Sequence, residues 1–148
     1  LQDNLMMFYI GHSRSANSIL SEQKKNMSQE DKVNNLLKMC SLAEQMKAAL
    51  ENNDLSSFGK IMNQSWELKR TLAAGISNPE IDRAYETAME NGALGGKLLG
   101  AGGGGFLLFY CEPQNQEKLR IAVGLKQMNF KFERDGTSVV YIGDKYWG

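Results

Sequence analysis

The sequence Gly95-Gly96-Lys97-Leu98-Leu99-Gly100-Ala101-Gly102-Gly103-Gly104-Gly105 is followed directly by the apolar run Phe106-Leu107-Leu108-Phe109-Tyr110-Cys111. Eight of the 15 glycines of the chain lie between Gly92 and Gly105. A glycine within regular structure costs about 0.5–1 kcal/mol of stability, so this density requires a reason. Consecutive residues without a Cβ can turn several N–H groups toward one anion, and we therefore expect the loop to contact a phosphate or a substrate. The alternative is a glycine-rich bend that packs against a helix.

Two familiar nucleotide-binding patterns do not account for this loop. Gly100, Gly102 and Gly105 have the spacing G-x-G-x-x-G, but a dinucleotide-binding loop of that kind opens a helix, whereas a strand-like run follows here. A Walker loop requires Lys and then Ser or Thr after its last glycine, and Phe106-Leu107 occupies those positions. Lys97 precedes the loop, where its ammonium could offset phosphate charge or could be a solvated side chain at the start of a strand.

The segments around the loop predict an antiparallel sheet. The strands expected from apolar runs and from alternation are Leu5–Ile10, Lys97–Leu99, Phe106–Cys111, Phe130–Glu133 and Val139–Ile142. Pro113 introduces a helix that we expect to reach about Lys126, and Asp135-Gly136 predicts a hairpin turn. This order predicts an α+β fold over residues 1–148 as one domain. Its antiparallel sheet should have helices packed on one face and the split βαβ character of ferredoxin-like folds.

Four further helices are expected between the first strand and the glycine loop. The first runs from Arg14 to about Lys25 with Ser13 as its cap, and the second follows a cap at Ser28. The second helix should bury one apolar stripe, made of Val33, Leu36, Leu37, Cys40, Ala43, Met46 and Leu50. The expected ends of the other two helices are marked by Asp54, Asn78-Pro79 and Asn91-Gly92.

Composition excludes several classes of function. Seventeen basic and seventeen acidic residues cancel, so no global field would draw the protein to nucleic acid or to an anionic membrane. Two distant cysteines, Cys40 and Cys111, and a single histidine do not make a metal site and favour a reduced, cytoplasmic protein. No apolar stretch approaches the roughly 20 residues that a bilayer requires. Since Leu1 is not an initiator and a strand-like run begins shortly after it, we expect a fragment of a longer protein.

Residues 97–105 resemble the third motif of the GHMP kinases, usually written Lys-Leu-Thr-Gly-Ala-Gly followed by more glycines. Leu99 replaces the usual threonine, which removes one hydroxyl near the site. Met62-Asn63-Gln64-Ser65-Trp66 and Ser77-Asn78-Pro79-Glu80-Ile81-Asp82 resemble the helix and the serine-proline-glutamate-x-aspartate segment that precede this motif in sugar kinases. The sequence is most similar to D-glycero-D-manno-heptose 7-phosphate kinases in three segments, Tyr9–Ala16, Ser65–Arg70 and Gly92–Lys97.

This resemblance implies a kinase that uses ATP and Mg²⁺ to phosphorylate the anomeric hydroxyl of a heptose 7-phosphate in nucleotide-heptose synthesis. It also implies that the catalytic residues and metal ligands belong to a preceding N-terminal domain, which would be the partner of this chain. The residues expected to bind ATP, phosphate or substrate are Lys97, Gly100, Ala101, Gly102, Gly103, Gly104 and Gly105. Alternatives are a GHMP kinase acting on fucose, galactose or another small alcohol, or a module that binds a small ligand without chemistry.

A substrate that already carries a phosphate needs a second cationic anchor. Arg14, near a predicted helix start, and Lys69 are the candidates, because a guanidinium or an ammonium can bind a phosphate directly. Lys69 could instead be solvated or interact favourably with the helix dipole, as positive charges late in a helix often do. Trp66 could stack on a sugar, but a tryptophan in an apolar helical stripe is expected in the core. His12 is expected to have a structural role or no role in the chemistry.

Overall fold

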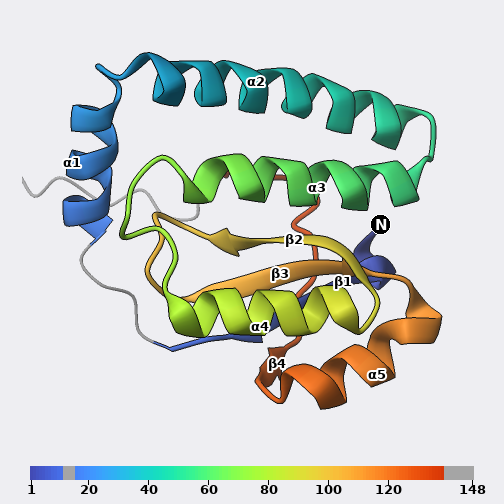
Figure 1. The fold of residues 1–148 in the computed structure, drawn as a ribbon. Coiled ribbons are helices and arrows are strands. Elements are labelled where there is room, and N and C mark those ends of the chain that lie inside the picture. Colours follow the sequence, from blue (N-terminus) through green and yellow to red (C-terminus); the bar gives the residue numbers. More distant parts are fainter. Residues whose placement is uncertain (12–15, 139–148) are drawn as a thin grey trace, which may run out of the picture.

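The computed structural model describes residues 1–11 and 16–138 of the chain. Its elements, in order, are η1 (Gln2–Asn4), β1 (Leu5–Tyr9), α1 (Ala16–Asn26), α2 (Glu30–Glu51), α3 (Leu55–Arg70), α4 (Pro79–Glu90), β2 (Ala93–Leu99), β3 (Phe106–Cys111), α5 (Pro113–Val123) and β4 (Lys126–Met128). Helices α4 and α5 lie side by side, α3 runs along the edge strand β2, and α2 lies outside α3 (Figure 1).

The sheet is antiparallel, as the sequence predicted. Its strand order is β2-β3-β1-β4, and all three strand pairs are antiparallel. Strand β1 is central and aligns Leu5 with Tyr110 and Tyr9 with Phe106 of β3. A first strand, helices, a strand hairpin, a helix and a last strand beside the first make a split βαβ arrangement. The α+β fold class is therefore confirmed.

One face of the sheet carries the core. Phe8 of β1 and Phe109 of β3 are fully buried, with ring centroids 6.1 Å apart. The ring of Tyr85 from α4 lies 5.5 Å from Phe109 and 5.8 Å from Trp66 of α3, so both helices close over the same cluster. Leu119 of α5 belongs to the same buried cluster. Trp66 is 1% exposed, which confirms its expected place in the core.

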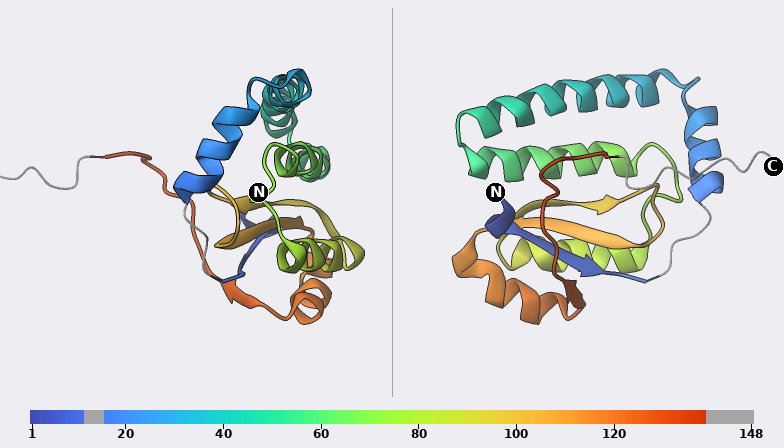
Figure 2. Two further views of the ribbon diagram at one scale, coloured as in Figure 1. Left: turned by 60° about the vertical axis from the view of Figure 1, so that its left-hand side comes forward. Right: turned by 180° about the vertical axis from the view of Figure 1, so that it is seen from behind.

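The chain after β4 departs from the prediction. The expected strand at 130–133 is not formed; the fourth strand is instead Lys126–Met128, which pairs with β1 directly after α5. The helix ends at Val123 rather than near Lys126, because Gly124 adopts a left-handed conformation and its N–H bonds to the carbonyl of Arg120. Residues 129–138 then cross the sheet face opposite α4 (Figure 2). The rings of Phe130 and Phe132 contact each other there. The strand expected at 139–142 lies outside the described residues.

Two predicted N-terminal helix caps are confirmed and one is wrong. The Asp54 carboxylate accepts from the N–H of Ser57, and the Asn78 side chain accepts from the N–H groups of Glu80 and Ile81. Ser28 does not cap α2; its hydroxyl donates to the carbonyl of Lys25, 3.0 Å away, and closes the preceding turn. The ends of α1 expected at Ser13 and Arg14 lie outside the described residues.

The apolar stripe predicted for α2 is right for Leu36 and Met46 and wrong for its other members, which are exposed. Leu37 is 62% exposed, and Val33, Cys40 and Leu50 are also exposed. The residues that face the rest of the chain are Leu36, Met39, Leu42, Met46 and Ala49. Helix α2 carries two apolar stripes, and only the second meets α3, because α2 is the outermost layer of the fold (Figure 1).

The two thiols differ in exposure, which predicts a difference in reactivity. Cys40 is exposed and Cys111 is buried at the end of β3. Burial, together with the nearby Glu112 carboxylate, raises the pKa of Cys111 to about 11. At pH 8 only about one Cys111 thiol in a thousand is then the reactive thiolate. We expect iodoacetamide to label Cys40 at least ~100-fold faster than Cys111 in the folded protein, as measured by peptide mass spectrometry. Similar rates in the folded protein would contradict this burial; in denaturant the difference should vanish.

Across the described ranges, no helix is both long and apolar enough to cross a bilayer. The same residues contain no group of three or more His, Cys, Asp or Glu side chains arranged to hold a metal ion.

Candidate functional site

The glycine loop of residues 100–105 connects β2 to β3 in a conformation that requires glycine. Gly100, Gly102, Gly103, Gly104 and Gly105 all have positive φ, between 78° and 154°. A Cβ on Gly102 would lie 2.6 Å from the Cα of Ile76, so the loop backbone rests directly on the segment before α4. This close approach is the reason that a β-carbon is excluded at Gly102.

Backbone hydrogen bonds fix both sides of the loop. The N–H of Gly103 donates to the carbonyl of Ile76 at 3.0 Å, and the N–H of Gly105 donates to the carbonyl of Gly11 at 3.0 Å. The N–H of Ile10 donates back to Gly105 at 3.0 Å. The loop therefore lies between the end of β1 and the start of α4.

Other N–H groups of the loop remain available. Within residues 1–11 and 16–138, no acceptor is found for the backbone N–H groups of Ala101, Gly102 and Gly104. Successive N–H groups in a chain of positive-φ residues can converge on an anion. The loop thus has the hydrogen-bond donors that a phosphate requires. Phosphate binding by residues 100–105 stays a prediction.

Lys69, one of the two predicted phosphate anchors, lies against the loop. Its Nζ, at the last turn of α3, donates to the carbonyl of Gly100 at 2.8 Å and to that of Leu98 at 3.4 Å. Burial lowers the pKa of Lys69, and the positive charge of Lys97 lowers it further. The two ammonium groups therefore act on the same region at the end of β2. The structure brings Lys69, Lys97 and the loop together, whereas Arg14 lies outside the described residues.

A polar cluster beside the loop was not predicted. Arg70 Nη2 lies 3.0 Å from Asp82 Oδ1, and the hydroxyl of Ser77 donates to the same oxygen at 2.6 Å. The Asn78 side chain, which caps α4, also donates to the carbonyl of Gly103 at 3.4 Å. The sequence contained a signal for these contacts, because Ser77 and Asp82 belong to the segment that resembles the sugar kinases. Their mutual contact could be read only from the structure.

Strand β2 is fixed on its other side by Tyr85. The hydroxyl of Tyr85 donates to Asn63 Oδ1 at 2.8 Å and accepts from the N–H of Gly96 at 3.0 Å. Burial raises the pKa of Tyr85, so the phenol stays protonated and keeps both bonds. Helices α3 and α4 are thereby tied to the strand that leads into the glycine loop.

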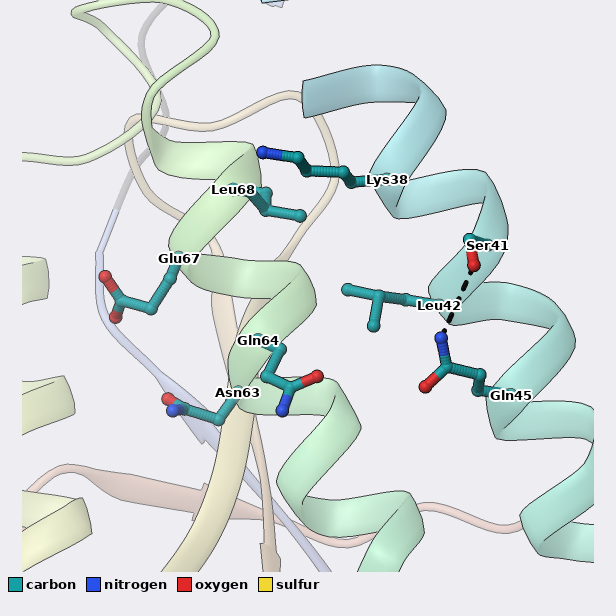
Figure 3. Close-up of a pocket in the computed structure, with 8 residues that line it drawn as sticks. All are labelled: Lys38, Ser41, Leu42, Gln45, Asn63, Gln64, Glu67 and Leu68. Carbon is teal, nitrogen blue, oxygen red and sulfur yellow. Dashed lines mark hydrogen bonds between the residues drawn. The ribbon is translucent and has the colours of Figure 1, made fainter. Parts of the chain in front are cut away.

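A separate groove lies between α2 and α3, with a volume of about 480 Å³. Leu42 extends from α2 toward α3, while the side chains of Asn63 and Glu67 point away from α2 (Figure 3). Its lining residues are Lys38, Ser41, Leu42, Gln45, Asn63, Gln64, Glu67 and Leu68. None of them belongs to the glycine loop, so this groove is not part of the site built around Lys69 and Lys97.

Comparison with known proteins identifies the family. Residues 46–127 match the family model described as GHMP kinases C terminal. D-glycero-alpha-D-manno-heptose 7-phosphate kinase of Campylobacter jejuni is 30% identical over 139 residues, which is 92% of this chain and 41% of that protein. The L-fucokinase/L-fucose-1-P guanylyltransferase of Bacteroides fragilis is 30% identical over 122 residues, covering 80% of this chain and 13% of that protein. The chain thus spans less than half the length of these relatives.

Solved structures of related folds agree with this result. L. major mevalonate kinase in complex with R-mevalonate superposes with a TM-score of 0.71 at 22% identity, covering 81% of this chain and 37% of that one. The Lin0012 protein of Listeria innocua gives a TM-score of 0.75 at 17% identity over 88% of this chain and 39% of that one. At these identities the likeness concerns the fold alone. With the family model covering more than half of its residues, the chain belongs to the GHMP kinases and matches their C-terminal part.

Proposed function

We propose that this chain is the C-terminal domain of an ATP-dependent kinase for a small sugar phosphate, and that D-glycero-D-manno-heptose 7-phosphate is its acceptor. The likeness to a heptose 7-phosphate kinase over 92% of the chain carries the proposal. The anomeric hydroxyl would receive the phosphoryl group, as the sequence resemblance implies. The product would enter nucleotide-heptose synthesis in the cytoplasm, a location that fits the two free cysteines.

The glycine loop has the chemistry that phosphoryl transfer needs from a binding wall. Such transfer depends mainly on holding the phosphate and neutralising its charge. The N–H groups of Ala101, Gly102 and Gly104 would hold phosphate oxygens of ATP or of the acceptor. Lys97 would add a positive charge at the entrance to the loop, and Lys69 would fix the position of Gly100 while contributing a second charge.

Magnesium does not fit the described residues of this chain. They hold no group of acidic or histidine side chains suited to a metal ion. We therefore assign Mg²⁺, the catalytic residues and the remaining ATP contacts to a preceding N-terminal domain, whose existence is supported by the 41% coverage of the heptose kinase relative. That domain would be the structural partner of residues 1–148, and the chain alone would have little or no turnover.

Two adjacent cations favour an acceptor that already carries a phosphate. Lys69 and Lys97 influence each other electrostatically, and in the described part of the chain neither forms a salt bridge with a carboxylate. Such a pair is stabilised when an anion lies between the two charges. Arg14, predicted as a further anchor, remains a proposal on the sequence alone. A neutral acceptor, such as the fucose of the fucokinase relatives, would gain less from this arrangement.

The test is ATP consumption by the full-length gene product with heptose 7-phosphate, fucose and galactose. We expect heptose 7-phosphate to be preferred by at least ~100-fold in kcat/KM, and the Lys97→Met variant to raise KM for it by about tenfold, since one charge-assisted contact is lost. Lys47→Met is the matched control, because Lys47 lies on α2 and its ion-pair partner among the described residues is the exposed Glu51.

Three results would count against the proposal. Preference for fucose or galactose would assign the chain to another GHMP kinase. Equal effects of Lys97→Met and Lys47→Met on KM would show that Lys97 does not anchor the phosphate. Inactivity of the full-length protein on every acceptor would leave the glycine loop as a binding feature without chemistry.

A further inference from the structure

The glycine loop rests on a short segment whose shape is set by one carboxylate. Asp82, in the first turn of α4, accepts on its Oδ1 from the hydroxyl of Ser77 at 2.6 Å and from Arg70 Nη2 at 3.0 Å. Arg70 is the last residue of α3, so the carboxylate joins the end of one helix to the start of the next. We call Arg70, Asp82 and Ser77 the brace.

The brace lies directly behind the loop. Ser77 stands between Ile76 and Asn78, and both neighbours contact Gly103: the carbonyl of Ile76 accepts its N–H at 3.0 Å, and the Asn78 side chain donates to its carbonyl at 3.4 Å. The Cα of Ile76 also blocks the space beside Gly102. Any rotation of the backbone at Ser77 would therefore move the surface on which the loop rests.

A contribution to the free energy of folding is not a sufficient reason for the brace. The side chains of Arg70 and Asp82 are 29% and 30% exposed, and partly exposed ion pairs contribute little to the free energy of folding. Arg70 has a second carboxylate partner in Glu67, at 3.7 Å, one turn earlier in α3. What Asp82 provides uniquely is a shared acceptor, because one oxygen fixes both the guanidinium and the Ser77 hydroxyl.

We infer that Asp82 is a positioning residue for the glycine loop, acting through Ser77 and Arg70 on the segment 76–78. The inference rests on the proposed kinase function where activity is concerned, but its structural part does not depend on that function. Asp82 touches neither ATP nor acceptor in this scheme. Its carboxylate keeps Ile76 and Asn78 where they hold Gly103, and the loop in turn keeps its N–H groups aimed at a phosphate.

Kinetics of the full-length protein test the functional part. In Asp82→Ala we expect kcat/KM for ATP to fall at least ~30-fold, because a loop displaced by a fraction of an ångström no longer meets the phosphate. Asp82→Asn keeps an acceptor for Ser77 and should recover most of this loss. A double substitution of Arg70 and Asp82 by alanine should be no worse than Asp82→Ala, since residues acting as one unit are not additive.

Asp54→Ala is the matched control for loss of stability. Asp54 caps the opposite end of α3 through the N–H of Ser57 and has no contact with the loop. It should lower the melting temperature by a similar amount and leave kcat/KM within about twofold of the unmodified protein. Equal kinetic losses in Asp54→Ala and Asp82→Ala would overturn the inference, because the effect would then follow stability alone.

Hydrogen exchange provides a readout that needs no catalysis. In Asp82→Ala, amides in the peptide 99–106 should exchange at least ~10-fold faster than in the unmodified full-length protein, since the bonds of Gly103 and Gly105 open more often. Asp54→Ala should leave this peptide unchanged. If the full-length protein proves inactive, accelerated exchange would still support the positioning role. Unchanged exchange in Asp82→Ala would refute it whatever the activity.

Discussion

The Gly95→Ala variant is expected to lose about 3 kcal/mol or more of its free energy of unfolding, because β2 and α3 touch through their backbones at this point. A Cβ on Gly95 would lie 2.0 Å from the carbonyl oxygen of Gly59 and 2.7 Å from the backbone nitrogen of Asn63. Neither atom can move without shifting the helix, and the opposite residue, Tyr110, lies against Gly59 in turn. The strand and the helix would have to separate.

Urea unfolding followed by circular dichroism measures this loss. Gly75→Ala is the control, since Gly75 has no positive φ and its Cβ would approach only side-chain atoms of Ile19, the nearest at 3.3 Å, and no backbone atom. We expect Gly75→Ala to change the free energy of unfolding by less than about 1 kcal/mol. A Gly95→Ala variant as stable as Gly75→Ala would show that α3 does not pack on β2 as described. A variant that fails to fold would agree with the expectation.

The close contact at Gly95 explains why the sequence predicted β2 too short. Glycines are poor strand formers, so the apolar run appeared to begin at Lys97, whereas the strand begins at Ala93. Glycine is required at Gly95 because α3 occupies the space of a Cβ there, and at Gly96 because the ring of Phe109 and the carbonyl oxygen of Leu108 do. Local propensity contains no information about such a contact, which joins residues from three elements.

Local signals were sufficient where the determining contact is local. The caps at Asp54 and Asn78 and the end of α4 at Asn91 involve residues within three positions of each other, and all were predicted correctly. The stripe of α2 and the strand at 130–133 failed because their outcome depends on distant partners. Leu37 is apolar but has no layer to cover it, and Phe130 and Phe132 alternate without a neighbouring strand to pair with.

The same distinction applies to the site. The glycine loop and Lys97 could be predicted, since the density of glycines and the flanking strands lie within one short segment. Lys69 was a candidate only because the resemblance implies a phosphorylated substrate, and its contact with Gly100, 31 residues away in sequence, could be read only from the structure. The contact of Arg70 with Asp82 depends on how α3 and α4 meet, which no periodicity in the sequence specifies.

The largest expected effect on activity belongs to Gly102→Ala in the full-length protein. A Cβ at this position would lie 2.6 Å from the Cα and 3.0 Å from the carbonyl oxygen of Ile76, and the φ of +127° is unfavourable for alanine. Ile76 is fully buried and cannot retreat. The loop must therefore lift from its support, and because a displacement near 1 Å at a reacting phosphate costs about 100-fold, we expect at least that loss in kcat/KM.

The Gly100→Ala variant measures the effect of backbone strain without a steric clash with Ile76. Gly100 also has a positive φ, +88°, but a Cβ there would meet no atom within 4 Å. Alanine at Gly100 therefore introduces strain of about 1–3 kcal/mol without pushing the loop from Ile76, and we expect a loss of about tenfold or less in kcat/KM. Equal losses in the two variants would mean that strain alone governs activity. An unchanged Gly102→Ala enzyme would mean that phosphate binding does not depend on contact between the loop and Ile76.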